Sequence, residues 1–408
     1  MNPPADASDP VLMKSSRFAL PKIITRPIEV TSVANRFASV AEPIACDAER
    51  ASGFRYGQKT CLLQIRSESF GTELIDTLAA PDLSLLSEPL SEHEWVIHAA
   101  VQDLPSLRDL NFSPKYLFDT EVAGRMLGLE HVNLGSMVEE FLHIKLTKAY
   151  SAVDWSTRPL PKEWLQYAVL DVELLIPLRR ELIKALETQG KLQWAQAEFQ
   201  AALDTPTPPQ RPDPWRRVSG IGAVRSRVGM AIIRELWLVR ERIAQNRDLP
   251  PGRVLTDSAL VAAAQQMPRT VGALSRLHHF GAPSQTRLLA TWHRAIETAL
   301  ATPKDELPEL RPPQHRSTPP VRAWKDRKPQ AHEMLLLARE VISEVAEELV
   351  IQPETLLTPD HLRRLCWELG RRPQAQDIAE LLRSFGARDW QIQIVAEELA
   401  EEFSYLES

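Results

Sequence analysis

Four acidic residues and one tyrosine have the types and surroundings that metal-assisted chemistry requires: Asp47, Glu49, Asp103, Tyr167 and Asp171. Each lies in or directly after an apolar segment, which would carry it toward an interior or a cleft. A carboxylate in such a place is costly unless a cation accompanies it. Because no lysines stand at matching points, the four carboxylates indicate divalent metal ions. Two cations held about 3.5–4 Å apart by carboxylates are a common arrangement for in-line cleavage of phosphodiesters.

The spacing of two residue pairs would place their side chains together. Asp47 and Glu49 are two positions apart in a strand-like segment, so both point to one face of a sheet and can share a cation. Tyr167 and Asp171 are four apart in a helical pattern, so they stack on one helix face. Taken singly, each residue also has a plain structural interpretation: a surface acid, a half-buried helix tyrosine or, for Asp103, a helix N-cap. The spacing alone leaves these interpretations open.

Residues 31–205 show the pattern of an α/β domain that would position these side chains. Three β-type runs come in close succession, as in a meander, and the later runs alternate with helical patterns. This order predicts a mixed sheet with helices packed on it. The predicted strands cover 43–49, 60–67, 71–76, 94–100 and 115–120, and the predicted helices cover 103–111, 120–129, 134–144 and 161–190.

The rest of the chain divides at its proline-rich stretches. With 408 residues the chain is too long for one core, which suggests two or three domains. Residues 1–30 are predicted to be a mobile tail, since proline, serine and small residues occur there without sustained periodicity. Residues 206–214 and 303–330 are predicted to be linkers, because their prolines prevent both helix and ladder. Residues 215–302 and 331–408 are predicted to be all-helical domains.

Charge is distributed unevenly along the chain. The net charge, counted as Lys and Arg minus Asp and Glu, is −9 for residues 31–205, +8 for residues 215–302 and −9 for residues 331–408. One basic module therefore follows an acidic α/β domain. A basic module of this size is a plausible electrostatic footprint for nucleic acid, although a well-solvated helical surface has the same composition.

The cysteines and the apolar runs indicate a cytoplasmic protein without a membrane partner. Cys46, Cys61 and Cys366 are not closely spaced, so they predict neither a disulfide framework nor a zinc motif. No run of about 18 uncharged apolar residues occurs, and the N-terminus lacks the order of a secretory signal. We therefore expect a reducing, cytoplasmic setting.

Together these residues resemble the ribonuclease D family of 3′–5′ exonucleases, a branch of the DEDD superfamily. The first family motif is matched by residues 47–49, the second by the segment "HAAVQDLPSL" with Asp103, and the third by Tyr167 and Asp171. A tyrosine four positions before the aspartate defines the "y" subtype. The family usually has threonine where this chain has Ala48, a side chain that points to the other face of the strand.

The resemblance extends to the helical part and implies the fold. Residues 215–302 look like a helicase-and-RNase-D C-terminal (HRDC) domain, a small module that binds nucleic acid. Residues 331–408 resemble the additional C-terminal helical domain of ribonuclease D proteins. The implied architecture is an α/β ribonuclease-H-like exonuclease domain, with a mixed sheet flanked by helices, followed by two all-α domains.

The resemblance also implies a role for each residue and a cofactor of two divalent metal ions, Mg²⁺ or Mn²⁺. One ion would be held by Asp47, Glu49 and Asp171, and Tyr167 would position the attacking water. The other would be held by Asp47 and Asp103. Since hard cations prefer oxygen ligands, the carboxylates suit either metal.

The expected function is metal-dependent 3′–5′ exoribonuclease activity on structured RNA 3′ ends, such as those of tRNA precursors. Two alternatives stay open. In the first alternative, the chain is a DNA 3′–5′ exonuclease acting on single strands, because none of these residues distinguishes a sugar with a 2′-hydroxyl from one without it. Or it is a non-catalytic nucleic-acid-binding protein on the same fold, against which the intact set of acids argues. The sequence does not fix the oligomeric state, and a monomer is favoured.

Overall fold

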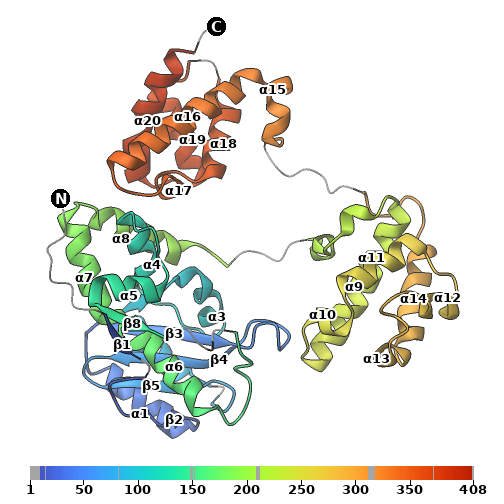
Figure 1. Cartoon of the computed structure of the whole chain (residues 1–408), viewed down its shortest axis with the longest axis horizontal. Helices are drawn as coiled ribbons and strands as arrows, with labels where there is room; N and C mark the ends of the chain where they lie inside the picture. Colours follow the sequence, from blue (N-terminus) through green and yellow to red (C-terminus); the bar gives the residue numbers. More distant parts are fainter. Residues whose placement is uncertain are drawn as a thin grey trace. The chain divides into compact units, whose positions relative to one another are not determined.

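The computed structural model describes the chain from residue 10 to residue 406, with short gaps. The residues outside the description are 1–9, 14, 81, 148–149, 151, 208–211, 311–317, 371 and 407–408. Parts of the predicted tail and of both predicted linkers therefore lie outside the described residues. The chain forms two compact units (Figure 1). The first comprises Met1–Arg50, Thr60–Pro206 and Arg316–Ser408, and the second comprises Ala51–Lys59 and Thr207–His315.

A six-stranded mixed sheet forms the centre of the first unit. Its strand order is β2-β5-β4-β3-β6-β7, in which β3, β4 and β5 are antiparallel neighbours and the remaining pairs are parallel. The predicted meander and the mixed sheet are thus confirmed. The strands are β2 (Ile23–Ile24), β3 (Ile44–Arg50), β4 (Thr60–Ser67), β5 (Gly71–Asp76), β6 (Glu94–Ile97) and β7 (Tyr116–Asp119).

Helices cover this sheet through their apolar faces, and a small second sheet joins β1 (Val11–Met13) to β8 (Ile144–Leu146) in parallel. The predicted single helix over 161–190 is two helices that meet at Leu174. Pro177 explains the break, because it has no N–H to continue the hydrogen-bond ladder of the first helix. The helices are α1 (Pro27–Phe37), α2 (Ser84–Ser91), α3 (Leu104–Arg108), α4 (Thr120–Met126), α5 (Leu134–Leu142), α6 (Lys162–Glu173), α7 (Leu175–Thr188) and α8 (Leu192–Asp204).

The prediction of a mobile tail over residues 1–30 does not match the part of that stretch that the structure describes. Two short strands and the start of α1 lie in it, and Met13, Ile24 and Val30 are buried in the core. Strands of two or three residues are too short to show the alternation of apolar and polar residues by which a strand is predicted. The start of α1 had a readable signal, since Pro27 occupies the first helical turn, where proline is favoured.

The C-terminal helices belong to the first unit and pack on its exonuclease-like part. Trp194 and Trp390 stack with ring centroids 5.1 Å apart, and Arg388 pairs with Glu198 at 2.7 Å. The linker predicted over 303–330 ends early, because Trp324 is fully buried and starts a helix. The elements are η4 (Val321–Ala323), α15 (Trp324–Arg327), α16 (Pro329–Glu348), α17 (Pro353–Leu356), α18 (Pro359–Glu368), α19 (Ala375–Phe385) and α20 (Asp389–Ser404).

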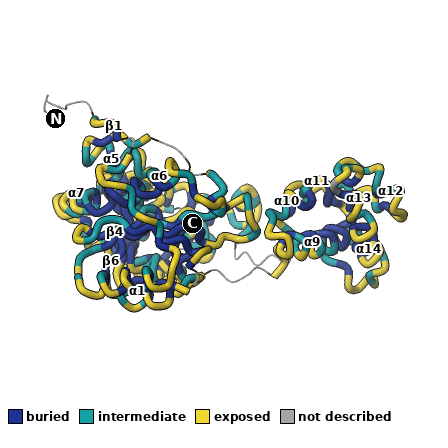
Figure 2. Tube along the Cα trace, turned by 90° about the horizontal axis from the view of Figure 1, so that it is seen from below, coloured by how far each residue is buried: buried dark blue, intermediate teal, exposed yellow. Residues whose placement is uncertain are grey.

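Every regular element among the described residues of the second unit is a helix, so residues 215–302 are all-helical, as predicted. Its buried residues gather along α9, α11 and α14 (Figure 2), around Phe280 and Trp292. No described helix of the chain is long and apolar enough to cross a membrane. The elements are η2 (Pro214–Arg217), η3 (Ile221–Ala223), α9 (Arg227–Arg247), α10 (Pro251–Val254), α11 (Asp257–Gln266), α12 (Val271–Ser275), α13 (Pro283–Thr286) and α14 (Leu289–Leu300).

Candidate active site

A cleft of about 350 Å³ in the first unit brings the predicted site residues together. Asp47, Glu49, Asp103, Tyr167 and Asp171 all line it, although they come from separate elements of the fold. The remaining lining residues are Ala48, Arg50, His98, Ala99, Gln102, Leu134 and Leu175.

Strand β3 and helix α6 supply three carboxylates that converge. Alternation along β3 points Asp47 and Glu49 to the same face, while Ala48 between them is buried and pairs with Leu63 of β4. Helix α6 packs against β3 and β4 and presents Asp171 to that face. Carboxylate oxygens of Asp47, Glu49 and Asp171 lie within 4.8 Å of one another. Such a spacing allows one cation to touch all three.

Asp103 joins the cleft from a short turn of the chain. It follows η1 (Ala100–Gln102) and stands at the N-cap position of α3, yet its carboxylate makes no capping hydrogen bond with that helix. The alternative of a capping side chain is therefore wrong. Instead, Asp103 pairs with Arg50 at 2.7 Å and shares a hydrogen bond with Asp47. Its side chain thus faces the other acids.

Arg50 is a charged residue of the cleft that the sequence reasoning missed. Its Nη1 donates to the carbonyl of Gln102 at 2.7 Å and to Ser106 Oγ at 3.4 Å, in addition to the pair with Asp103. The guanidinium therefore ties the end of β3 to the Asp103 turn. Its position directly after Glu49 was the only available signal.

Asp119 is a second missed residue, and it fixes the turn ahead of Asp103. It ends β7, is fully buried, and accepts hydrogen bonds from the backbone N–H groups of Ala99 at 3.1 Å and Ala100 at 2.8 Å. The same carboxylate caps α4 by accepting from Glu121 N and Val122 N. An acid between an apolar strand and a helical pattern is a readable N-cap signal.

The electrostatics of the cleft disfavour four ionised acids. Burial, followed by the charges of Asp47 and Asp171, raises the pKa of Glu49 to about 10. Burial and the Asp47 charge raise the pKa of Asp103 to about 7 and that of Asp171 well above its usual range. Because like charges and lost hydration both oppose ionisation, these carboxylates need cations to become charged together.

Tyr167 contributes a neutral phenol to this group. Burial and the neighbouring charges of Asp171 and Glu49 raise its pKa above the usual range, so it keeps its proton at any ordinary pH. The phenol shares a hydrogen bond with Asp171, one helical turn further along α6. A held O–H group beside a carboxylate cluster suits the orientation of a water molecule.

The donor set fits hard divalent cations. Every ligand in the converging cluster is a carboxylate oxygen, which Mg²⁺ and Mn²⁺ prefer over sulfur or imidazole ligands. The raised pKa values follow from the same clustering and burial, and binding of a metal ion would release the protons that these acids hold.

Comparison with protein families agrees with this arrangement. Residues 21–187 match a family described as 3′-5′ exonuclease, residues 230–296 match the HRDC domain, and residues 317–403 match a 3′ to 5′ exonuclease C-terminal domain. Ribonuclease D of Sphingobium indicum is 30% identical over 276 residues, which cover 66% of this chain and 71% of that protein. Ribonuclease D of Zymomonas mobilis is 30% identical over 294 residues, covering 70% and 75%.

Solved structures show the same architecture. A protein from Bifidobacterium adolescentis has a TM-score of 0.88 at 34% identity and covers 97% of this chain and 100% of its own. RNase D of Escherichia coli, an exoribonuclease involved in structured RNA processing, has a TM-score of 0.69 at 26% identity and covers 95% and 99%. The similarity thus extends over the α/β part and the helical parts alike.

Proposed function

The chain belongs to the ribonuclease D family of 3′–5′ exoribonucleases, and we propose that its five cleft residues remove nucleotides from RNA 3′ ends by metal-assisted hydrolysis. The observation that carries this proposal is the convergence of Asp47, Glu49 and Asp171, within 4.8 Å, beside the neutral phenol of Tyr167. The exonuclease domain of this family is metal-dependent, which agrees with the cluster of carboxylates in the cleft.

Each residue has a distinct part in the proposed reaction. Asp47, Glu49 and Asp171 would hold one divalent ion, Mg²⁺ or Mn²⁺, and Asp47 with Asp103 would hold a second. When bound, the two cations neutralise the phosphate and make a water molecule more acidic. The Tyr167 hydroxyl donates its hydrogen bond to Asp171 and would orient that water through its oxygen, and its raised pKa keeps the phenol neutral. Asp171 anchors this hydroxyl from the next turn of α6.

The substrate part of the proposal rests on charge and on the family. The acidic exonuclease part repels phosphates until cations bind, whereas the HRDC-like residues 215–302 carry a net charge of +8 and would supply a salt-dependent grip. Structured RNA 3′ ends such as those of tRNA precursors are the proposed substrates. We further propose a monomer in the cytoplasm, without a membrane partner.

We also propose that the chain has three functional domains, at residues 31–205, 215–302 and 331–408. Their support is the order of the matched families. The structure groups the third of these with the first, so residues 331–408 act as part of the catalytic unit.

A direct assay tests the proposal. The purified full chain is incubated with Mg²⁺ or Mn²⁺ and a 5′-labelled tRNA precursor that has a 3′ extension, in parallel with DNA of the same sequence. We expect stepwise shortening of the RNA that stops with EDTA and is lost in Asp103→Asn. Failure to shorten the RNA, or equal activity in Asp103→Asn, would overturn the site. Preference for the DNA strand would overturn the proposed substrate.

A further inference from the structure

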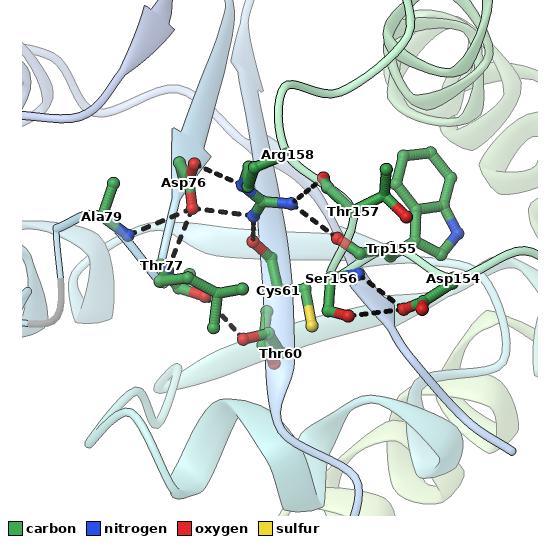
Figure 3. A network of polar contacts seen from close by, with 11 residues as sticks. Thr60, Cys61, Asp76, Thr77, Ala79, Asp154, Trp155, Ser156, Thr157 and Arg158 are labelled. Atoms are coloured by element: carbon green, nitrogen blue, oxygen red, sulfur yellow. Dashed lines mark hydrogen bonds and ion pairs between the residues drawn. The ribbon is translucent and has the colours of Figure 1, made fainter. Parts of the chain in front are cut away.

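An arginine outside the cleft, Arg158, has all of its donors bonded although its side chain stays 27% exposed. Arginine has five N–H donors, and all five of Arg158 are used (Figure 3). Nε and Nη2 donate to the two carboxylate oxygens of Asp76 at 2.6 and 2.7 Å. The other three bonds reach backbone carbonyls of Cys61 at 2.8 Å, Trp155 at 2.7 Å and Thr157 at 2.8 Å.

The Asp76 side of this network is anchored in the sheet. Asp76 ends β5 and is buried, and its Oδ1 also accepts from the backbone N–H groups of Leu78 at 3.0 Å and Ala79 at 3.2 Å. Beside it, Thr77 Oγ1 donates to the carbonyl of Thr60 at 2.5 Å, at the start of β4. Although burial opposes it, the hydrogen bonds and charge of Arg158 hold the pKa of Asp76 below its usual range. Arg158 is thus bound to a rigid and charged support.

The other side of the network holds the turn that carries Trp155. Asp154 Oδ1 accepts from both the backbone N–H and the hydroxyl of Ser156, at 3.1 and 2.5 Å. The Trp155 ring is fully buried, with its centroid 5.5 Å from that of Trp164 and 6.5 Å from that of Tyr167. Arg158 therefore binds the backbone of the residue whose ring packs behind the proposed water-orienting tyrosine.

We infer that Arg158, braced by Asp76, is a positioning residue for Tyr167. It fixes the 154–158 turn on the ends of β4 and β5, and the turn fixes Trp155 against the Tyr167 ring. Asp47 and Glu49 stand on β3, and none of the five Arg158 hydrogen bonds reaches that strand. Loosening it should displace the phenol while the carboxylate cluster stays able to bind cations. This inference rests on the role proposed for Tyr167.

The test uses the full chain and a conservative variant. Arg158→Lys keeps the positive charge but loses the planar fork that serves Asp76 and the three carbonyls. Since a misplacement of about 1 Å is enough to slow a reaction by up to 10²-fold, we expect kcat on the RNA 3′ end to fall about 10-fold. The KM for RNA and the Mn²⁺ affinity, measured by calorimetry, should each stay within about 2-fold, since neither depends on the phenol.

Arg179→Lys is the matched control. Arg179 makes the same two-point contact with Glu94, at 2.5 and 2.7 Å, and both side chains are part-buried in the same unit. No contact joins this pair to Tyr167 within the described residues. Arg179→Lys should lower thermal stability about as much as Arg158→Lys and leave kcat unchanged. An equal loss of kcat in both variants would show that Arg158 is merely structural and would overturn the inference.

A double-mutant cycle identifies the residue through which Arg158 acts. If Arg158 works through the Tyr167 hydroxyl, then Arg158→Lys should cost less than about 2-fold once Tyr167→Phe is present. An undiminished 10-fold loss in that background would overturn the inference.

A spectroscopic readout separates this inference from the proposed function. The chain has five tyrosines, so 3-fluorotyrosine labelling gives few ¹⁹F signals, and Tyr167→Phe identifies the one from residue 167. Arg158→Lys should shift that signal, and Arg179→Lys should not. If the wild-type chain leaves RNA intact but the signal shifts, the proposed function fails while the positioning holds. An unmoved signal in Arg158→Lys would overturn the positioning whatever the activity.

Discussion

Two groups of buried acids in the same unit have opposite electrostatic situations. In the cleft, Glu49 has neighbouring carboxylates, and burial with their charges raises its pKa to about 10. At the end of β5, Asp76 has the Arg158 guanidinium and two backbone N–H groups, and its pKa is lowered. In the cleft, Arg50 pairs with Asp103 while the other carboxylates lie against one another, whereas Asp76 has a guanidinium whose five donors are all used.

The difference shows how the unit divides stability and function. The carboxylate cluster costs folding free energy at neutral pH, because its acids must either hold protons or repel one another until ions arrive. The Arg158–Asp76 network is satisfied within the protein, which makes it a rigid support for the turn before α6. Substitutions in the cleft should therefore change mainly activity, whereas substitution of Asp76 should change mainly stability.

The largest effect is expected from Asp47→Asn, which removes the acid shared by both proposed cation sites. The kcat on RNA should fall by at least about 10³-fold, because charge stabilisation of the phosphate is lost. The melting temperature of the metal-free protein should rise by about 2–4 °C, since a buried amide neither has to hold a proton nor repels the neighbouring carboxylates. Steady-state kinetics and thermal unfolding in EDTA measure the two quantities.

Asp119→Asn serves as the comparison, because Asp119 is buried like the cleft acids but is bound to backbone N–H groups. It should lower the melting temperature. If Asp47→Asn lowers the metal-free melting temperature as much as Asp119→Asn does, the cleft acids are not a stability cost and the comparison between the two groups fails.

The next largest effect is expected from Tyr167→Phe. The ring and its packing against Trp155 stay, while the hydroxyl that would orient water is removed. We expect kcat to fall about 10²-fold, the usual scale for a positioned proton-transfer or water-binding group. The affinity for Mn²⁺, measured by calorimetry, should change less than about 2-fold, because the phenol is not a proposed ligand. A variant that loses cation binding instead would make Tyr167 a ligand.

The sequence predicted the acids of the cleft, but it did not predict the Arg158–Asp76 network that we infer to position Tyr167. Strands β3, β4 and β5 have apolar alternation or continuous burial, so their order and the same-face placement of Asp47 and Glu49 followed from the pattern. The roles within the cluster came from family motifs, since each residue alone had a plain alternative. Arg158 and Asp76 are 82 positions apart, and three of the five bonds go to backbone carbonyls, which leave no trace in side-chain types.

The same limit explains the errors at the N-terminus and in helix 161–190. Strands β1 and β2 are two or three residues long, and their pairing with β8 and β5 depends on tertiary contacts and not on local sequence. The break at Leu174 keeps both helices apolar on one face, so periodicity continues across it. Pro177 was the one local signal, and it separates α6 with Tyr167 and Asp171 from α7.

A moderate loss of stability is expected from Asp76→Asn. The neutral amide leaves the Arg158 guanidinium without its counter-charge, although part of that guanidinium stays in water. We expect the free energy of unfolding to fall by about 2 kcal/mol, below the full cost of an unpaired buried charge. Urea denaturation measures it. Glu121→Gln, which breaks the half-exposed i,i+4 pair with Arg125 on α4, is the control and should cost no more than about 0.5 kcal/mol. Equal costs would mean that the Arg158 network behaves as a surface pair.

The sharpest test of sign is the pH dependence of the metal-free protein. The pKa of Glu49 is about 10 in the folded chain, whereas an unfolded glutamate titrates near about 4.3. The folded state therefore holds a proton that the unfolded state has lost. Its contribution to the free energy of unfolding is fully present below the pKa of the unfolded glutamate and is lost as pH rises toward 10. Asp76 has the opposite sign, because its lowered pKa contributes stability above the unfolded value that is lost only in acid.

Urea denaturation in EDTA between pH 6 and pH 9 should therefore show a stability that declines with pH. Glu49→Gln removes one of the titrating cleft acids and should make this decline shallower, whereas Asp76→Asn should lower the whole curve without changing its slope in that range. Saturating Mn²⁺ should abolish or reverse the decline in the wild-type chain, because the cation replaces the proton as the counter-charge. An unchanged slope in Glu49→Gln would mean that the cleft acids are ionised without cations and that the contrast with Asp76 is not electrostatic.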